Sequence, residues 1–169
     1  NGQLGDGSAS GESSPVEVSG LPRASDLAAG EDHTCAVLHN GQIQCWGRGR
    51  EGQLGDGDTA NKRLPVKVKG IANAVQVEAA GNHTCALLKS GTVECWGAND
   101  DGELGTGDEQ MRTRPSQVKS VTDVIEIGVG QHHSCAITRI REAFCWGLND
   151  DGQLGDGSTN QSNTPVAVQ

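Results

Sequence analysis

Large apolar and aromatic side chains are scarce in this sequence of 169 residues. It contains no Tyr, one Phe, one Met and three Trp, and only 34% of its residues are hydrophobic. Such a chain cannot fill one large core, and its 25 glycines disfavour long helices. No apolar run approaches the roughly 18 residues that span a bilayer, so no membrane span is expected. Many short strands joined by glycine turns suit this composition.

Positive charge is also in short supply. The chain has 13 Lys and Arg against 22 Asp and Glu, which gives a formal net charge of −9. Because an acidic surface repels phosphate, we expect no nucleic-acid partner. The nearest approach to a basic patch lies within residues 48–69 of a single stretch, and the ordinary interpretation is a solvated loop and strand face.

A unit of fifty residues recurs without insertion. GQLGDG at residues 2–7 returns at 52–57 and 152–157, and as GELGTG at 102–107; a Pro that opens a strand recurs at Pro15, Pro65, Pro115 and Pro165. We therefore divide one repeat domain, 1–169, into repeats 2–51, 52–101 and 102–151 and a partial repeat 152–169. The chain starts inside a repeat, without Met or a signal peptide, so we expect a piece excised or processed from a longer protein.

Each repeat carries four strand signals. In the second repeat they occupy residues 65–68, 74–79, 83–88 and 92–97. The second of these alternates, which predicts Val75, Val77 and Ala79 on one buried face, as for their counterparts fifty residues later. Four antiparallel strands in about fifty residues make one blade of a β-propeller, so we predict an all-β fold. Each blade needs a neighbour on both sides, and three complete repeats do not close a ring.

The cysteines form one pair in each repeat, spaced Cys-x9-Cys: Cys35 and Cys45, Cys85 and Cys95, Cys135 and Cys145. If Gly41 is a bulge glycine and Leu38 faces Gln42, counting back sets the first pair opposite each other, with Cα atoms about 4.5 Å apart. That distance permits a bridge, which stabilises the fold by at most about 3 kcal/mol. The third repeat has Ile140 in place of the glycine, so we expect a different turn there.

Zinc is the alternative use of these thiols, with His33, Asp32, Cys35 and Cys45 as ligands. Neighbouring strand cysteines favour pairing with each other, and tetrahedral zinc sites favour closer spacings such as Cys-x2-Cys. Cystine is therefore the preferred interpretation. Three bridges indicate an oxidising compartment, so we expect a secreted, periplasmic or cell-surface protein.

Residues 83–107, HTCALLKSGTVECWGANDDGELGTG, resemble the regulator-of-chromosome-condensation repeat family, in the cysteine-bearing form of bacterial secreted and surface proteins. The resemblance recurs in phase over essentially the whole chain. It implies a propeller, most often of seven blades, of which this chain supplies about half; missing repeats or further copies of the chain complete it. Known members include a nucleotide exchange factor on chromatin, a plant ultraviolet photoreceptor and a secreted β-lactamase inhibitor. The lack of a basic tail and of clustered Trp argues against the first two.

Two residue types recur in phase in every repeat: His33, His83 and His133, and Trp46, Trp96 and Trp146. A catalytic residue is needed only once, so threefold repetition indicates structural roles. We expect the histidines to make a hydrogen bond that fixes the start of a strand, and the tryptophans to pack the blades. No unrepeated catalytic set stands out, so we predict neither an enzyme nor a cofactor.

Adjacent carboxylates in glycine loops offer weak calcium candidates, at Asp100, Asp101, Asp150 and Asp151. The spacing of an EF-hand is absent, and the first repeat has Arg48 and Arg50 in the same loop. Because Asn, Asp and Gly are ordinary turn residues, we favour a turn and predict no metal.

The segments after each LGDG turn differ between repeats, at residues 8–14, 58–64 and 108–114. Variable connections on a constant scaffold are the usual place for recognition. The candidate binding residues are Glu12, Lys62, Arg63, Glu109, Met111 and Arg112. We therefore predict a non-enzymatic, extracellular platform that binds a protein or a surface ligand. The alternatives are a self-assembling scaffold and, by family analogy, a guanine-nucleotide-exchange or chromatin-type regulator.

Overall fold

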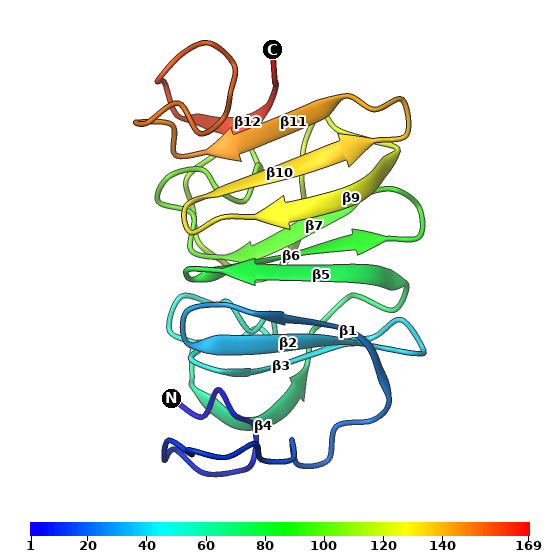
Figure 1. The fold of residues 1–169 in the computed structure, drawn as a ribbon, viewed down its shortest axis with the longest axis vertical. Helices are drawn as coiled ribbons and strands as arrows, with labels where there is room; N and C mark the ends of the chain where they lie inside the picture. The colour runs from blue at the N-terminus through cyan, green and yellow to red at the C-terminus, as the bar shows by residue number, and fades with distance from the viewer.

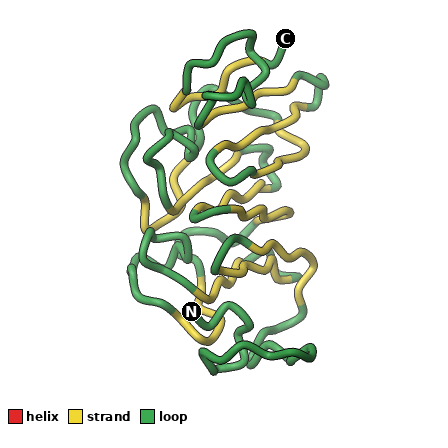
Figure 2. Tube along the Cα trace, turned by 60° about the vertical axis from the view of Figure 1, so that its left-hand side comes forward, coloured by secondary structure: helices red, strands yellow, loops and turns green.

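The computed structural model describes all residues from Asn1 to Gln169 and contains strands and loops but no helix (Figures 1 and 2). The strands are β1 (Ala24–Ala29), β2 (His33–Leu38), β3 (Ile43–Gly47), β4 (Lys62–Lys67), β5 (Ala74–Ala80), β6 (His83–Leu88), β7 (Val93–Gly97), β8 (Arg112–Gln117), β9 (Val124–Val129), β10 (His133–Thr138), β11 (Ala143–Gly147) and β12 (Ser162–Ala167). The predicted all-β class is confirmed. The structure contains no helix that is long and apolar enough to cross a membrane.

The strands form three antiparallel sheets of four, in the order β1 to β4, β5 to β8 and β9 to β12. We call these sheets blade one, blade two and blade three. They stack one above another in Figure 1, from the blue end of the chain to the red end. The structure is thus three consecutive blades of a propeller, as the repeat predicts.

The outer strand of each blade comes from the sequence repeat that follows. β4 lies in repeat 52–101 yet pairs with β3 of the preceding repeat, and β12 in the partial repeat completes blade three. The prediction of a strand opening at Pro15 is wrong, because residues 11–19 form no strand. A strand at that point would pair with a third strand of a preceding repeat, and no strand precedes Pro15 in this chain.

A β-bulge changes the predicted faces of the second strand signal. The register of β5 against β6 slips between Ala74 and Gln76, which leaves Val75 unpaired and 46% exposed. Ile125 is left out in the same way in β9 and is 36% exposed. The prediction of a buried face is therefore wrong for these two residues and confirmed for Val77 and Ala79, which are buried beyond the bulge.

The predicted pairing of the cysteines is confirmed. In each blade the two cysteines face each other across the central strand pair, with Cα atoms 4.1 Å apart and a disulfide bond between them. Leu38 donates its N–H to the Gln42 carbonyl at 2.8 Å, which is the closing pair that the spacing predicts. No free cysteine remains.

The prediction of a different turn in the third repeat is wrong. The residue in the position of Gly41 is Arg141, not Ile140, and Arg141 adopts the left-handed backbone itself, with φ of 68°. The Thr138 N–H donates to the Glu142 carbonyl at 2.9 Å, as Leu38 does to Gln42. The hairpin is therefore kept, at the cost of strain in a residue with a side chain.

The hydrophobic cores lie between blades. Cys35, Val37 and Ile43 of blade one pack in one cluster with Val77 and Trp96 of blade two. A second cluster joins blades two and three around Trp146. Burial thus depends on the neighbouring blade, and each of the two interfaces contains one tryptophan, Trp96 or Trp146.

One side chain of blade one is far more exposed than its counterparts in the other two blades. Leu27 is 63% exposed, whereas Val77 and Ile127, which hold the same position in the next two blades, are 1% and 4% exposed.

Replacing Arg141 by Gly should raise the free energy of unfolding by about 1 kcal/mol, because Gly adopts a positive φ without strain. Chemical denaturation of the disulfide-intact protein measures the change. Arg139→Gly in the same hairpin is the control, since Arg139 has no positive φ; that variant should lose stability. Equal effects of the two variants would contradict the assignment of strain to Arg141.

The bridge between Cys135 and Cys145 should be reduced before the other two. Cys135 is only partly buried on the flank of blade three, whereas Cys35, Cys45, Cys85 and Cys95 are almost completely buried between blades. Limited treatment with a phosphine reductant, followed by alkylation and peptide mass analysis, follows the three bridges separately. Simultaneous loss of all three bridges would contradict protection by neighbouring blades.

Candidate functional site

The long connections all gather at one end of the blade stack. The connections β3–β4, β7–β8 and β11–β12 and the turns β1–β2, β5–β6 and β9–β10 lie on the left in Figure 1, and we call this side the loop end. The hairpins β2–β3, β6–β7 and β10–β11 lie at the opposite side, the hairpin end. The long connections contain segments whose sequence differs between repeats, and these differences therefore lie mostly at the loop end.

A backbone carbonyl ties each of the β3–β4 and β7–β8 connections to the next blade. The Gln53 carbonyl accepts hydrogen bonds from the Trp96 indole at 2.8 Å and from the Thr84 hydroxyl at 3.0 Å, both in blade two. Gly55 follows with φ of +67°, and a Cβ there would lie 2.8 Å from the indole nitrogen, so only glycine fits. The carbonyls of Gln3 and Glu103 are held in the same way, by Trp46 with Thr34 and by Trp146 with Ser134.

The repeated histidines also connect blades. His33 Nε2 shares a hydrogen bond of 2.8 Å with the Thr84 hydroxyl, and His83 Nε2 shares one of 2.9 Å with the Ser134 hydroxyl. The expected structural hydrogen bond of each histidine thus joins neighbouring blades, and the sequence analysis had not identified its partner. His133 has no following blade and is half-buried.

Burial controls the protonation of the two inner histidines. Desolvation lowers the pKa of His33 to about 4, although the Asp32 carboxylate opposes the shift. Desolvation lowers the pKa of His83 to about 3, and the neighbouring histidines act in the same direction. Both rings are therefore neutral at physiological pH, which suits their place between apolar surfaces.

Buried asparagines set the shape of the long connections. The Asn99 amide donates to the carbonyls of Asp108 at 2.8 Å and Gln110 at 3.1 Å, and its oxygen accepts the Leu104 N–H at 2.9 Å. Asn149 makes the equivalent bonds in blade three. The same loop conformation is thus kept around different exposed residues.

The predicted binding residues are spread over strands and loops. Lys62 and Arg63 lie in β4, Arg112 begins β8, Glu109 and Met111 lie in the β7–β8 connection, and Glu12 lies in the segment before β1. Lys62 contacts the Asp58 carboxylate at 2.9 Å, and Arg112 contacts Asp108 at 2.6 Å. Met111 is 44% exposed. Two of the three cations are therefore engaged in local pairs. The exposed Glu109 carboxylate accepts a hydrogen bond of 3.2 Å from the Gln161 amide of the β11–β12 connection, and Met111 has an exposed side chain at the loop end.

An unrepeated group of metal-ligating side chains lies where blades two and three meet. Asp101 and Glu103 come from the β7–β8 connection, and His132 from the β9–β10 turn. One ligand atom of each lies within 4.8 Å of the others, and His132 Nδ1 is 3.0 Å from an Asp101 oxygen. Glu103 is 2% exposed, and burial raises the pKa of its carboxyl. Only Asp101 of this group was among the calcium candidates.

The equivalent positions elsewhere in the chain hold an amide in place of the Glu103 carboxylate. Between blades one and two the Gln53 amide donates to the Asn82 side chain at 3.0 Å, and the Gln3 amide donates to Asp32 at 3.3 Å. Glu103 and His132 are therefore departures from the repeat. Comparison of the repeats position by position would have revealed them in the sequence.

The remaining calcium candidates are not brought together. Asp100 lines the same cavity as Asp101 but is exposed. Asp150 and Asp151 are exposed in the equivalent loop of blade three, and no cluster of ligating side chains includes them.

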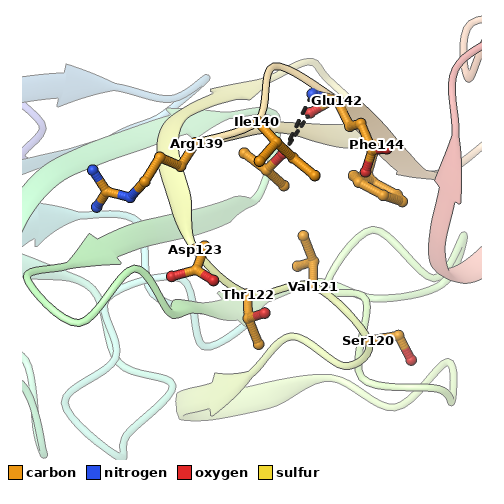
Figure 3. Close-up of a pocket in the computed structure, with 9 residues that line it drawn as sticks. Ser120, Val121, Thr122, Asp123, Arg139, Ile140, Glu142 and Phe144 are labelled. Atoms are coloured by element: carbon orange, nitrogen blue, oxygen red, sulfur yellow. Dashed lines mark hydrogen bonds between the residues drawn. The ribbon is translucent and has the colours of Figure 1, made fainter.

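A hollow of about 300 Å³ lies at the hairpin end of blade three. Figure 3 shows Arg139, Ile140, Glu142 and Phe144 on one side and the connection before β9, from Ser120 to Asp123, on the other. In the preceding blade the same turn carries the following connection, since the Val124 N–H donates to the Gly91 carbonyl at 3.0 Å. The hollow therefore lies beside the turn that, in the preceding blade, contacts the following connection.

Comparison with known families gives a match along the whole chain. The sequence profile of the "Regulator of chromosome condensation (RCC1) repeat" matches residues 1–37, 40–87, 90–137 and 142–169. A second profile of the same repeat matches residues 24–53, 74–103 and 124–153, each of which contains the three inner strands of a blade. No curated protein sequence matches the chain.

Solved structures share the fold. Prp20p from Saccharomyces cerevisiae is 22% identical with a TM-score of 0.86, and the match covers 100% of this chain and 45% of that protein. Human WBSCR16 is 21% identical with a TM-score of 0.79, over 88% of this chain and 41% of that protein. The chain thus spans less than half the length of these proteins.

The free energy of unfolding should fall as the pH drops below about 6.5. His33 and His83 stay neutral in the fold but gain a proton on unfolding, so their stabilisation is complete above the unfolded pKa and is lost toward the folded values of about 4 and about 3. Each contributes up to about 1.4 kcal/mol per pH unit. Urea denaturation between about pH 7 and 5 measures the slope.

The variant His33→Gln keeps a hydrogen-bond donor toward Thr84 and removes one titrating group. It should show about half the pH dependence attributed to the pair. An unchanged slope in this variant would assign the pH dependence to other groups.

Proposed function

The chain belongs to the regulator of chromosome condensation (RCC1) repeat family, and from that premise we propose that it serves as an extracellular platform that binds another protein through its loop end. The proposed role is non-enzymatic. The propeller is the rigid part, and the β3–β4, β7–β8 and β11–β12 connections supply the contacts.

This proposal rests on one observation. Two connections have the same hydrogen-bonded shape but different exposed residues. Asn99 and Asn149 hold the two connections by the same three types of hydrogen bond. The exposed residues that they support are unlike each other, Asp-Glu-Gln-Met at 108–111 and Ser-Thr-Asn-Gln at 158–161. A constant loop frame with changing surface residues is suited to recognition.

The position of the repeated histidines supports a non-catalytic role. His33 and His83 are almost completely buried between blades and are engaged with hydroxyls of the neighbouring blade. A general base must reach a proton of the substrate, and these rings have no such access.

The disulfides support an extracellular setting. Three bridges form within one chain of this size, and cytosolic thiols are kept reduced. They also compensate for the small apolar content of the blades by restricting the unfolded chain.

The net charge of −9 favours a protein partner over nucleic acid. The yeast protein Prp20p has been described with binding properties toward Gsp1p and histones, and a protein partner for this chain would be an interaction of the same kind. The exposed Met111 and the neighbouring Glu109 form a mixed apolar and acidic surface on the β7–β8 connection of blade two, the middle blade.

Exchange of the blade-two loop for the blade-three loop tests the proposal. The variant Asp108→Ser, Glu109→Thr, Gln110→Asn, Met111→Gln and Arg112→Ser keeps the asparagine frame, so its thermal unfolding should change little. It should lose the protein that the native chain captures from the secreted and surface fraction of its source cells, as measured by quantitative mass spectrometry.

The matched control changes exposed residues at the hairpin end, His39→Ser with Lys89→Ser, and should capture that protein undiminished. Equal capture by both variants would refute binding through the loop end. The native mass of the purified chain tests the alternative scaffold role, because a self-assembling array would exceed the mass of one chain.

A further inference from the structure

We propose that Asp101, Glu103 and His132 form a binding site for a divalent transition-metal ion of the zinc type, which joins blades two and three at the loop end. This site is independent of the proposed protein binding. It differs from the calcium candidates in its ligands and in its ion.

The ligands are placed by the bonds that hold the blades together. The Glu103 carbonyl accepts the Trp146 indole at 2.9 Å and the Ser134 hydroxyl at 3.0 Å, which fixes the backbone from which its carboxylate extends. His132 lies in the turn just before that serine. Two short segments from different blades are therefore held at a fixed separation before any ion binds.

The Glu103 carboxylate is buried without a cationic partner. It is 2% exposed, and no Lys or Arg forms an ion pair with it. The backbone N–H groups of Asp101, at 3.0 Å, and of Glu103 itself donate to the carboxylate, so its partners are uncharged. A buried carboxylate is costly without a neutralising group, and a metal ion between it, Asp101 and His132 supplies one.

Space is available beside these groups. They line a cavity of about 230 Å³, together with Glu51, Asn82 and others. Zinc sites that are not fully closed by protein ligands complete their coordination with water, and this cavity opens to solvent through the exposed His132.

The donor set selects the class of ion. One imidazole nitrogen and two carboxylates suit Zn²⁺ and related first-row ions. Calcium needs six to eight oxygen ligands, and the imidazole is a poor substitute for oxygen. We therefore expect Zn²⁺ to bind much more tightly than Ca²⁺.

The repeat provides a matched pair of variants. Glu103→Gln with His132→Asn installs the amide pair that Gln53 and Asn82 form at the preceding junction, so the fold should be retained. Arg48 holds the Glu51 carboxylate in an ion pair of 3.0 Å, and the next repeat has Ala98 in the position of Arg48. The reciprocal change, Gln53→Glu with Asn82→His and Arg48→Ala to release Glu51, should create a second site. No structural loss accounts for both results at once.

Calorimetric titration of the untagged, disulfide-intact chain with ZnCl2 tests the proposal. The native chain should bind one Zn²⁺, and the Glu103→Gln, His132→Asn variant should bind it at least about a hundredfold more weakly. The reciprocal variant should bind two ions. Bound Zn²⁺ should also raise the thermal midpoint of the native chain but not that of the loss variant.

Absence of Zn²⁺ binding, or unchanged binding by the loss variant, would overturn the proposal. Binding of Ca²⁺ in preference to Zn²⁺ would do the same. If the reciprocal variant folds and binds only one ion, these three positions are not sufficient to define a site. Glu103→Gln alone serves as a second loss variant should the double change unfold the junction.

Discussion

The structure depends on one interaction between neighbouring blades. A backbone carbonyl of one blade accepts hydrogen bonds from a Trp indole and from a Thr or Ser hydroxyl of the next blade. Gln53 and Glu103 present these carbonyls, and Trp96 and Trp146 donate to them at 2.8 and 2.9 Å. Because an indole has a single N–H and is costly to bury unpaired, the tryptophan needs that carbonyl in one position. These hydrogen bonds therefore hold the long connection in place, although this part of the connection pairs with no strand. The cores and the histidine bonds between blades rely on the same alignment.

Elements that depend on local pattern were predictable from the sequence. The cysteine pairing followed from alternation across a hairpin, and the three inner strands of each blade from their short apolar runs. Val75 escaped prediction because a bulge moves it to the exposed side, and a period of two does not reveal a bulge. The partners of His33 and His83 escaped because they lie in another blade, 51 residues away. Contacts between repeats leave no trace in the period of a single repeat.

The same reasoning explains why the candidate metal site was missed. Threefold repetition directed attention to residues that are the same in every repeat, and such residues maintain the scaffold. In the positions of Glu103 and His132, the junction between blades one and two holds Gln53 with Asn82, and the contact of the N-terminal segment with blade one holds Gln3 with Asp32. In a repeat protein, each repeat can be compared with the others position by position. A buried residue that differs from its counterparts is therefore more informative about function than the repeated motif around it.

Departures of this kind differ in what they cost the fold. Arg141 accepts a left-handed backbone where the other blades have glycine, and its hairpin keeps the same hydrogen bonds. Glu103 accepts burial of a carboxylate where the other repeats have an amide. The first lies in the β10–β11 hairpin, where Arg141 is exposed. Glu103 lies between two packed blades, where an uncompensated charge is most unfavourable. A bound cation would compensate that charge, so Glu103 is the departure for which we propose a ligand.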